Sequence, residues 1–410
     1  MNCKIANKYD YMIIILISSL AFGNMGGAMH LNRILTILFV PFIFSYPKIL
    51  EKNHIKNYVI FFIILISYSI ISLLWSYNPL EGCVEIIYLI LYSCLFIELY
   101  IFSLLSTNPL KSIIYGWTIS LCITLSIGCW ELVTDHHLST SKLDSGHMNN
   151  IGDGVIILQK FAAATFVNYN TYVSFLCFAL PFLLYSISYS KRYKLYKFLL
   201  FTLCVICILS NASRGGLLSI TTMIIVYMLC KHKYKYLLTI GIIFSIIISF
   251  ILDNTDISFL TLISHRASAE NLLNGDSRFN LWLVSVKILI STFFIGIGVG
   301  GMEQHFIEHN MSLHIPHNLI IELMLKFGLI IGCIVIFQFV YILFNIRRIK
   351  NHSIRILLYT ALITFPIYSI INSGYILDEY VYATMACWII FYNYGINRFN
   401  YQVLSKARKL

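Results

Sequence analysis

Residues 319–345 read LIIELMLKFGLIIGCIVIFQFVYILFN, an apolar run that is long enough to cross a lipid bilayer as a helix. Apolar runs of about 20 residues span a hydrocarbon core about 30 Å thick, and such runs recur along the whole chain. Of the 410 residues, 59% are hydrophobic and only 11% are charged, whereas soluble domains carry about 25% charged residues. Most of this chain therefore cannot face water, and we predict an all-α polytopic membrane protein.

The apolar runs predict about twelve transmembrane helices in a single membrane domain, residues 1–410. The N-terminal run follows Lys4 and Lys8 as in a signal peptide. Because many further runs follow, we interpret it as an uncleaved signal anchor. The predicted spans are residues 11–29, 31–47, 57–75, 83–105, 112–133, 169–189, 195–210, 215–230, 236–252, 319–345, 354–373 and 376–394.

The basic residues lie in short clusters between the apolar runs, and they favour alternate loops. With a cytoplasmic N-terminus, the inside loops hold most of them, including Lys48–Lys56, Lys191–Lys194 and Arg347–Arg355. We therefore expect both termini in the cytoplasm, for a protein of the bacterial inner membrane. Topology explains the net charge of +11 without nucleic acid as a partner.

Two long segments are predicted on the external face, residues 134–168 and 253–318. The second carries a short helical pattern from Arg278 to Leu289, which could lie at the membrane surface or re-enter it partway. The pattern ends at Gly296–Gly301. We interpret this glycine cluster as a flexible turn, because no strand–helix unit of a dinucleotide site surrounds it.

The cysteines and histidines give weak signals. Nearly all of the 11 cysteines lie within apolar runs, which favours packing over disulfide or redox chemistry. Four histidines are close in sequence, but no cysteine partner or H-E-x-x-H motif accompanies them, so we expect no metal and no cofactor. These histidines are His305, His309, His314 and His317.

Arg214 lies between two predicted spans, in Ser213-Arg214-Gly215-Gly216, on the external side. A cation within a membrane helix costs roughly 2.5–3.5 kcal/mol, and an external position also opposes the positive-inside rule. A bound anion would compensate for both, and the two glycines would allow close approach of a ligand or of backbone. The alternative is an arginine that extends to a lipid headgroup.

Arg278 follows Asp276 and Ser277, either of which could cap the helix that begins there. A guanidinium in the first helical turn is unfavourable for the helix dipole, but an anion bound at that helix start would reverse the effect. The alternative is an ion pair with Asp276 or Glu270.

His317 lies in Pro316-His317-Asn318, at the external mouth of a long span. A histidine there could orient or deprotonate a hydroxyl near neutral pH, or it could contact a headgroup. Asn168 and Asn170 lie at another external helix start, where helix capping alone would explain them. We list Asn168, Asn170 and Asn318 as candidate substrate-binding residues.

Two arginines and one histidine are thus predicted at the same membrane face. Paired guanidinium groups suit a membrane-embedded pyrophosphate, because their forked donors match phosphate oxygens. If the pyrophosphate leaves during a reaction, the arginines would stabilise the developing negative charge.

The sequence resembles the superfamily of O-antigen ligases and polymerases, over about residues 160–345. Four short segments carry the resemblance, and Tyr169 stands where the family usually has proline. They are residues 166–182, Ser213-Arg214-Gly215-Gly216, Ser277-Arg278 with Trp282 and the glycine cluster, and Pro316-His317-Asn318-Leu319 as far as Glu322 and Gly328-Leu329-Ile330.

The resemblance implies a metal-independent membrane glycosyltransferase of the GT-C-like type, whose donor is a glycan on undecaprenyl pyrophosphate. Arg214 and Arg278 would hold the pyrophosphate, and His317 would contact the acceptor hydroxyl or the donor. An acceptor hydroxyl then attacks the anomeric carbon at the periplasmic face. The residue that acts as general base stays open.

The superfamily contains two activities, and the segment around Asn170 together with the Pro-His-Asn motif favours a polymerase. A polymerase joins lipid-linked repeat units, and a chain-length regulator is then a further candidate partner. The alternative is a ligase that transfers the glycan to the lipid A core. A transporter of lipid-linked sugars or a non-catalytic scaffold are further readings, but the nearly charge-free span centres and Arg214 argue against them.

Overall fold

The computed structural model describes residues 7–50, 53–141, 148–150, 156–158, 160–189, 193–232, 278–311 and 315–396. Within these ranges the chain forms 14 α-helices and one short hairpin, so the predicted all-α class is confirmed for nearly all of it. The predicted span 236–252 lies outside the described residues, as does the first part of the predicted external segment 253–318.

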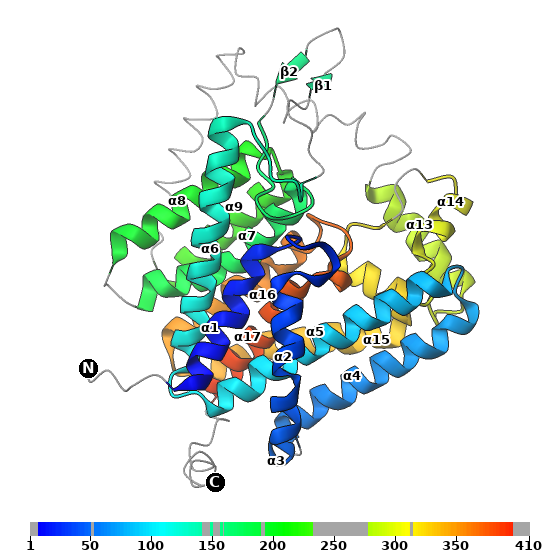
Figure 1. The fold of residues 1–410 in the computed structure, drawn as a ribbon, viewed down its shortest axis with the longest axis horizontal. Helices are drawn as coiled ribbons and strands as arrows, with labels where there is room; N and C mark the ends of the chain where they lie inside the picture. Colours follow the sequence, from blue (N-terminus) through cyan, green and yellow to red (C-terminus); the bar gives the residue numbers. More distant parts are fainter. Residues whose placement is uncertain are drawn as a thin grey trace.

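The N-terminal part folds into long helices whose starts are well marked (Figure 1). Proline occupies the first position of three of them, where its fixed φ fits the helix and its missing N–H is not needed. The Asp10 carboxylate accepts hydrogen bonds from Ser106 and Ser112, which fixes α1 to the connection between α5 and α6. The elements are α1 (Lys8–Ser18), η1 (Ser19–Phe22), η2 (Gly27–Met29), α2 (Leu31–Ser45), α3 (Pro47–Leu50), α4 (Asn53–Ser72), η3 (Leu73–Trp75), α5 (Pro79–Leu105) and α6 (Pro109–Thr134).

The middle part contains the hairpin and five helices. Strands β1 and β2 are antiparallel, with Asn149 opposite Ile157, and they lie beyond the end of α6 (Figure 1). Helices α13 and α14 show that the described part of the predicted external segment is helical. The elements are β1 (Met148–Asn150), β2 (Ile156–Leu158), α7 (Tyr169–Tyr189), α8 (Lys194–Ser210), α9 (Arg214–Cys230), α13 (Arg278–Ser291) and α14 (Met302–Glu308).

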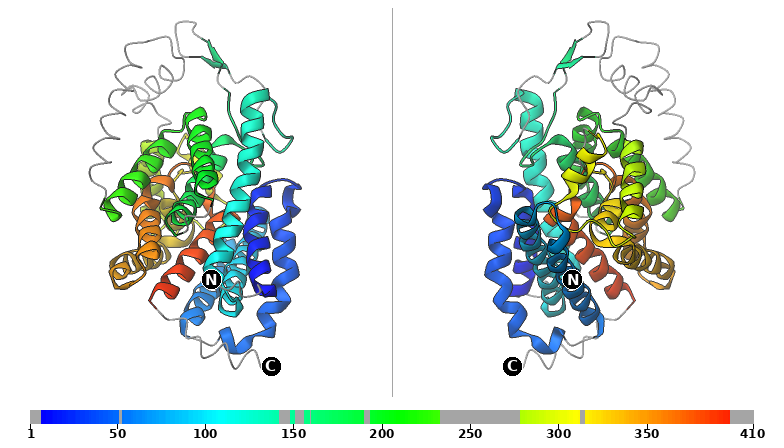
Figure 2. Two further views of the ribbon diagram at one scale, coloured as in Figure 1. Left: turned by 90° about the vertical axis from the view of Figure 1, so that its left-hand side faces the viewer. Right: turned by 90° about the vertical axis from the view of Figure 1, so that its right-hand side faces the viewer.

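The C-terminal part joins the other two. Helix α16 packs against α7 and α9, α17 packs against α5, and α13 runs beside α15. The right-hand view of Figure 2 looks onto the side that carries α13 and α14. The elements are α15 (Leu319–Asn345), η4 (Ile346–Arg348), α16 (His352–Tyr368), η5 (Tyr375–Leu377) and α17 (Glu379–Gly395).

Five described helices are long and apolar enough to cross a membrane, so this is a multi-pass membrane protein. Several helices at other predicted spans, such as α8 and α9, have 17 residues and rise about 26 Å, at the lower limit for crossing. The count of about twelve spans is therefore met only in part. The five helices lie in Ile55–Trp75, Pro79–Leu105, Pro109–Thr134, Tyr169–Tyr189 and Leu319–Arg348.

The first predicted span, residues 11–29, is too long. The α-helix ends at Ser18 and the following 3-10 turn at Phe22. The chain then turns through Gly23, Gly26 and Gly27, all at positive φ, which side chains rarely tolerate.

The helix ends define two poles of the molecule. Asn7, just before α1, donates a hydrogen bond to Leu105 O, and Asn393, near the end of α17, donates one to the Tyr100 hydroxyl. The start of α1 and the end of α17 therefore both lie beside the C-terminal part of α5. The start of α17 lies at the opposite pole, where the candidate site is found.

Candidate active site

Arg278 begins α13 and reaches the C-terminal end of α16. Its Nη1 donates to Ile370 O at 2.6 Å, and its Nη2 donates to Ile371 O at 3.2 Å. Carbonyls that follow a helix C-terminus favour a cation, so Arg278 is compensated by α16 although it opposes the dipole of its own helix. Neither Asp276 nor Glu270, the predicted ion-pair partners, lies within the described residues. Of the five N–H groups of the guanidinium, two are used by these carbonyls.

Arg214 begins α9, next to the same carbonyls. Ser213 caps the helix by accepting a hydrogen bond from Gly216 N. A Cβ on Gly215 would lie 3.0 Å from Ile371 Cγ1, so the start of α9 touches the segment that Arg278 binds. The side chain of Arg214 is exposed. Burial lowers the pKa of Arg278, and the charge of Arg214 lowers this pKa further, so the two guanidinium groups feel each other.

The two glycines after Arg214 pack against protein. A Cβ on Gly216 would lie 2.7 Å from Val173 Cγ1 and 2.8 Å from Ile208 Cγ2. The close approach expected at this motif is thus made by side chains of α7 and α8.

His317 also lies near Arg278, whose charge acts on it. It is half-buried, and its backbone has a left-handed φ of 49°. Trp282, one turn after Arg278, holds the preceding residue through a 2.7 Å hydrogen bond from Nε1 to Pro316 O. Burial and the charge of Arg278 lower the pKa of His317 to about 4, so the imidazole is neutral at pH 7. Its buried Nδ1 has no hydrogen-bond partner among the described residues.

Together these residues form a pole of positive charge beside a neutral imidazole. The charge of Arg278 interacts with both Arg214 and His317, and the two guanidinium groups repel each other. A dianionic group between them would relieve the repulsion and could accept forked hydrogen bonds. A neutral imidazole can accept a proton from a hydroxyl, which a charged one cannot do.

The three asparagines differ in role. Asn168 Oδ1 accepts hydrogen bonds from N and Oγ1 of Thr171 at the start of α7. Asn318 Oδ1 accepts from Ile320 N at 3.0 Å and from Ile321 N at 3.2 Å, and so caps α15. Helix capping alone therefore explains both side chains. Asn170 is half-buried, and in the described part of the chain its side chain forms no hydrogen bond.

The α16–α17 connection, residues 369–378, was missed by the sequence analysis, yet it meets most parts of the site. Leu319 N donates to Ser369 O at 3.1 Å, and Arg278 donates to the next two carbonyls. Asn372 Oδ1 lies 3.2 Å from Thr171 Oγ1. Starts of α7, α9, α13 and α15 therefore converge on this connection. The sequence signal for this connection was the stretch INSGYILDEY, residues 371–380, which carries polar residues between two apolar runs.

The predicted spans 354–373 and 376–394 correspond to α16 and α17, but their facing ends were placed too close together and left almost no room for a connection. Helix α16 ends at Tyr368 and α17 begins at Glu379. Asp378 at the end of the connection accepts a hydrogen bond from Tyr380 OH at 3.0 Å and one from Asn372 Nδ2 at 3.3 Å.

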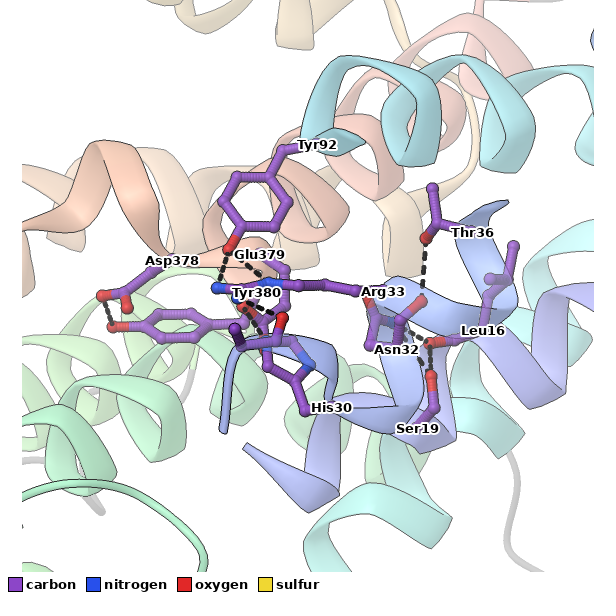
Figure 3. A network of polar contacts seen from close by, with 11 residues as sticks. Leu16, Ser19, His30, Asn32, Arg33, Thr36, Tyr92, Asp378, Glu379 and Tyr380 are labelled. Carbon is purple, nitrogen blue, oxygen red and sulfur yellow. Dashed lines mark hydrogen bonds and ion pairs between the residues drawn. The ribbon is translucent and has the colours of Figure 1, made fainter. Parts of the chain in front are cut away.

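A buried polar network fixes the α1–α2 turn to the same connection (Figure 3). Arg33 is only 8% exposed, lies 3.9 Å above the Tyr88 ring, and donates to the Tyr92 hydroxyl through Nε and Nη2. His30 Nε2 lies 3.7 Å from Glu379 Oε2, at the first residue of α17. Arg33 is thus embedded between helices.

The glycine cluster Gly296–Gly301 is packed, which corrects its interpretation as a flexible turn. Residues 296–300 are buried, and Ile297 N and Gly298 N donate to Leu325 O and Lys326 O of α15. A Cβ on Gly300 would lie 2.2 Å from Asn78 O, so only glycine allows this approach. The loop is wedged between α5 and α15.

The spans hold more buried charged side chains than the Lys326 that the sequence analysis allowed for, which weakens the argument from nearly charge-free span centres against a transporter. Lys326 Nζ lies 2.8 Å from Glu85 Oε1, and both side chains are buried. Glu85 Oε2 also accepts a hydrogen bond from Gly300 N at 3.3 Å. Glu98 in α5 is 0% exposed, and Glu322 in α15 is 1% exposed. Lys326 and Glu85 thus join α15, α5 and the glycine cluster.

Two of the histidines after the glycine cluster, His305 and His309, contact protein groups. His309 Nδ1 lies 2.8 Å from His305 O, and the His305 ring packs against Tyr77 at 4.5 Å. Among the described residues, no three His, Cys, Asp or Glu side chains are grouped to hold a metal ion. His314 lies outside them.

Comparison with known proteins places a family match over the part of the chain that holds Arg214, Arg278 and His317. Residues 198–337 match the model of the O-antigen ligase family. The teichuronic acid biosynthesis protein TuaE of Bacillus subtilis strain 168 is 23% identical over 350 residues, covering 79% of this chain and 70% of that protein. The predicted resemblance is therefore confirmed. Three of its four segments lie in the matched region, so residues 198–337 are similar to the O-antigen ligase family.

Proposed function

We propose that this protein is a membrane glycosyltransferase that extends a polysaccharide from lipid-linked glycan units. The donor is a glycan on undecaprenyl pyrophosphate, and the acceptor is a second lipid-linked unit, as for an O-antigen polymerase. The observation that supports this best is the pole formed by Arg214, Arg278 and His317. It combines two guanidinium groups with a neutral imidazole at the mouth of a long membrane helix.

In the proposed reaction, the acceptor hydroxyl attacks the anomeric carbon of the donor sugar. A new carbon–oxygen bond forms as the bond to the pyrophosphate oxygen breaks. Arg214 and Arg278 would bind the pyrophosphate and stabilise the charge that develops on it. The hydroxyl proton would pass to neutral His317 or to water. Asn170 is a candidate contact for the glycan, whereas Asn168 and Asn318 would act by holding the helix starts that carry the site.

The position of the site supports an external location. The site lies at the pole opposite the start of α1 and the end of α17. If these ends are cytoplasmic, as the basic loops favour, the site faces the periplasm or the outer face of the membrane. The name of the Bacillus subtilis relative refers to biosynthesis of teichuronic acid, which supports a role in polysaccharide synthesis.

A reconstituted assay tests the proposal. Purified protein in lipid nanodiscs is given a lipid-linked repeat unit, and products are separated by size while released undecaprenyl pyrophosphate is measured. A polymerase gives a ladder of products, with one undecaprenyl pyrophosphate released for each glycosidic bond formed. The variants Arg214→Ala and Arg278→Ala, checked by size-exclusion chromatography, should insert normally and give no ladder.

The same assay separates the rival functions. An O-antigen ligase gives product only after a lipid A core acceptor is added, and then a single transfer for each glycan. A transporter moves the lipid-linked unit across the bilayer and leaves it covalently unchanged. An unchanged substrate with both acceptors present would refute a glycosyltransferase.

A further inference from the structure

An elongated cavity of about 450 Å³ lies between α4, α15 and α17. Its volume is within the range of about 300–1,000 Å³ that is typical of ligand sites. From Val381 to Asn393 it follows thirteen residues of α17, a rise of about 18 Å. Its walls are mainly apolar and aromatic, and they include Phe62, Leu323, Val335, Tyr382, Met385 and Trp388.

One end of the cavity adjoins the candidate active site. Leu319, Tyr375 and Ile376 line this end. Leu319 is two residues after His317, and its N–H donates to Ser369 O, next to the carbonyls that bind Arg278. A chain attached to a group at the guanidinium pole could therefore enter the cavity directly.

The side of the cavity opens toward the surface that faces lipid. Ile334 and Tyr341 line it although they are 48% and 37% exposed, respectively. They belong to the same exposed apolar face of α15 as Phe337 and Phe344. A hydrocarbon chain can thus enter from the bilayer without crossing a polar surface.

The polar groups of the cavity do not require a polar ligand. Gln338 Nε2 donates to the Tyr58 hydroxyl at 3.0 Å, and Asn393 Nδ2 donates to the Tyr100 hydroxyl at 2.9 Å. Since these groups are paired with protein, the remaining wall suits a hydrocarbon.

We propose that this cavity binds the hydrocarbon chain of the lipid-linked donor whose diphosphate meets Arg214 and Arg278. This inference rests on the proposed function and adds to it a site that selects donors by their chain. Binding of the hydrocarbon chain would position the donor next to His317. Binding energy from this remote part of the substrate would thus orient the anomeric carbon for reaction.

The kinetic test uses two donors with the same glycan diphosphate, one on undecaprenol and one on geraniol. Met385→Trp fills the cavity, whereas Met385→Leu nearly conserves the volume of the side chain. The control Ile330→Trp places the same indole ring on the outer face of α15, where Ile330 is 77% exposed. We expect Met385→Trp to raise KM for the long donor roughly tenfold, equivalent to losing the burial of about two methylene groups. The short donor should be unaffected by Met385→Trp. Met385→Leu should change KM for the long donor much less than Met385→Trp does, and the control Ile330→Trp should resemble wild type.

Equal use of both donors by the wild type would overturn the proposal, as would an equal effect of Met385→Trp on both.

No turnover with either donor would count against the proposed function, and a second experiment then tests the cavity by itself. Undecaprenyl diphosphate with a diazirine on its chain is crosslinked to wild-type protein in nanodiscs, and the adducts are mapped. Adducts on Tyr382 or Met385 that unlabelled undecaprenyl diphosphate removes support the proposal. Adducts elsewhere would show that the chain binds outside the cavity, and adducts that excess phospholipid removes equally well would show that ordinary bilayer lipid occupies it. Either result would overturn the proposal.

Discussion

Lys326 and Arg278 are both cations in apolar surroundings, but the protein compensates them differently. Lys326 is paired with Glu85 at 2.8 Å, and both side chains are buried. Arg278 donates to two backbone carbonyls and has no carboxylate partner among the described residues, while the charge of Arg214 lowers its pKa. Lys326 thus holds helices together, and the different surroundings of Arg278 support our proposal that it binds an anion.

The largest expected effect comes from breaking the Lys326–Glu85 pair. Lys326→Met leaves the Glu85 carboxylate buried without its partner, which should lower the free energy of unfolding by about 3–5 kcal/mol. The measurement is the unfolding transition of the detergent-solubilised protein. If Lys326 serves only as a structural link, the protein that stays folded should keep its kcat.

A double variant separates this loss from a general packing defect. Lys326→Met with Glu85→Leu removes both charges, so most of the stability should return. A part should stay lost, because Gly300 N also donates to Glu85 and would be left unpaired. A double variant as unstable as Lys326→Met would show that the ion pair is not the cause.

The next effect concerns Arg278, where the loss should appear in catalysis. Arg278→Lys keeps the charge but cannot offer the planar fork that binds phosphate oxygens. We expect kcat/KM to fall about 10²–10³-fold, as when a donor to a developing oxyanion is removed. The matched control is Arg33→Lys, at a buried arginine that donates to Tyr92 and lies outside the pole. Full activity in Arg278→Lys would show that a point charge is enough.

Local features of the sequence predicted helices well. The bounds 169–189 and 319–345 agree with α7 and α15, because apolar runs and capping asparagines are local signals. The sequence predicted three residues of the pole on one membrane face. It did not predict the α16–α17 connection, whose backbone holds Arg278. The carbonyls of Ile370 and Ile371 bind Arg278 across 92 and 93 residues, and no periodicity reports such a contact.

The glycine cluster Gly296–Gly301 also shows that local sequence patterns do not reveal long-range contacts. As a sequence it has the composition of a turn, and its packing depends on glycines of other spans. A Cβ on Gly328 would lie 2.2 Å from Ile295 O, and Gly328 has a φ of 81° where α15 is kinked. Such a close backbone approach needs glycine at both places, and only the fold reveals which segments meet.

A smaller effect is expected in the pH dependence. Because burial and Arg278 lower the pKa of His317 to about 4, the imidazole stays neutral in the free protein from about pH 5 upward. The acid limb of kcat/KM should therefore lie near pH 4, below the ordinary histidine value of 6.5. A bound diphosphate stabilises the protonated form, so the acid limb of kcat should lie at higher pH. An acid limb of kcat/KM near pH 6.5 that His317→Gln leaves in place would remove His317 from the proton transfer.

The smallest effect should come from Glu98, which contrasts with Glu85 on the same helix. Glu98 is 0% exposed, and neither carboxyl oxygen has a hydrogen-bond partner among the described residues. Because an isolated buried charge is too costly, this carboxyl group is neutral in the folded protein. Glu98→Gln should therefore change the free energy of unfolding by less than about 1 kcal/mol, whereas Glu85→Gln should cost about 3–5 kcal/mol by leaving Lys326 unpaired. Parallel unfolding of the two variants checks this, and equal losses would mean that Glu98 is ionised and holds a cation of its own.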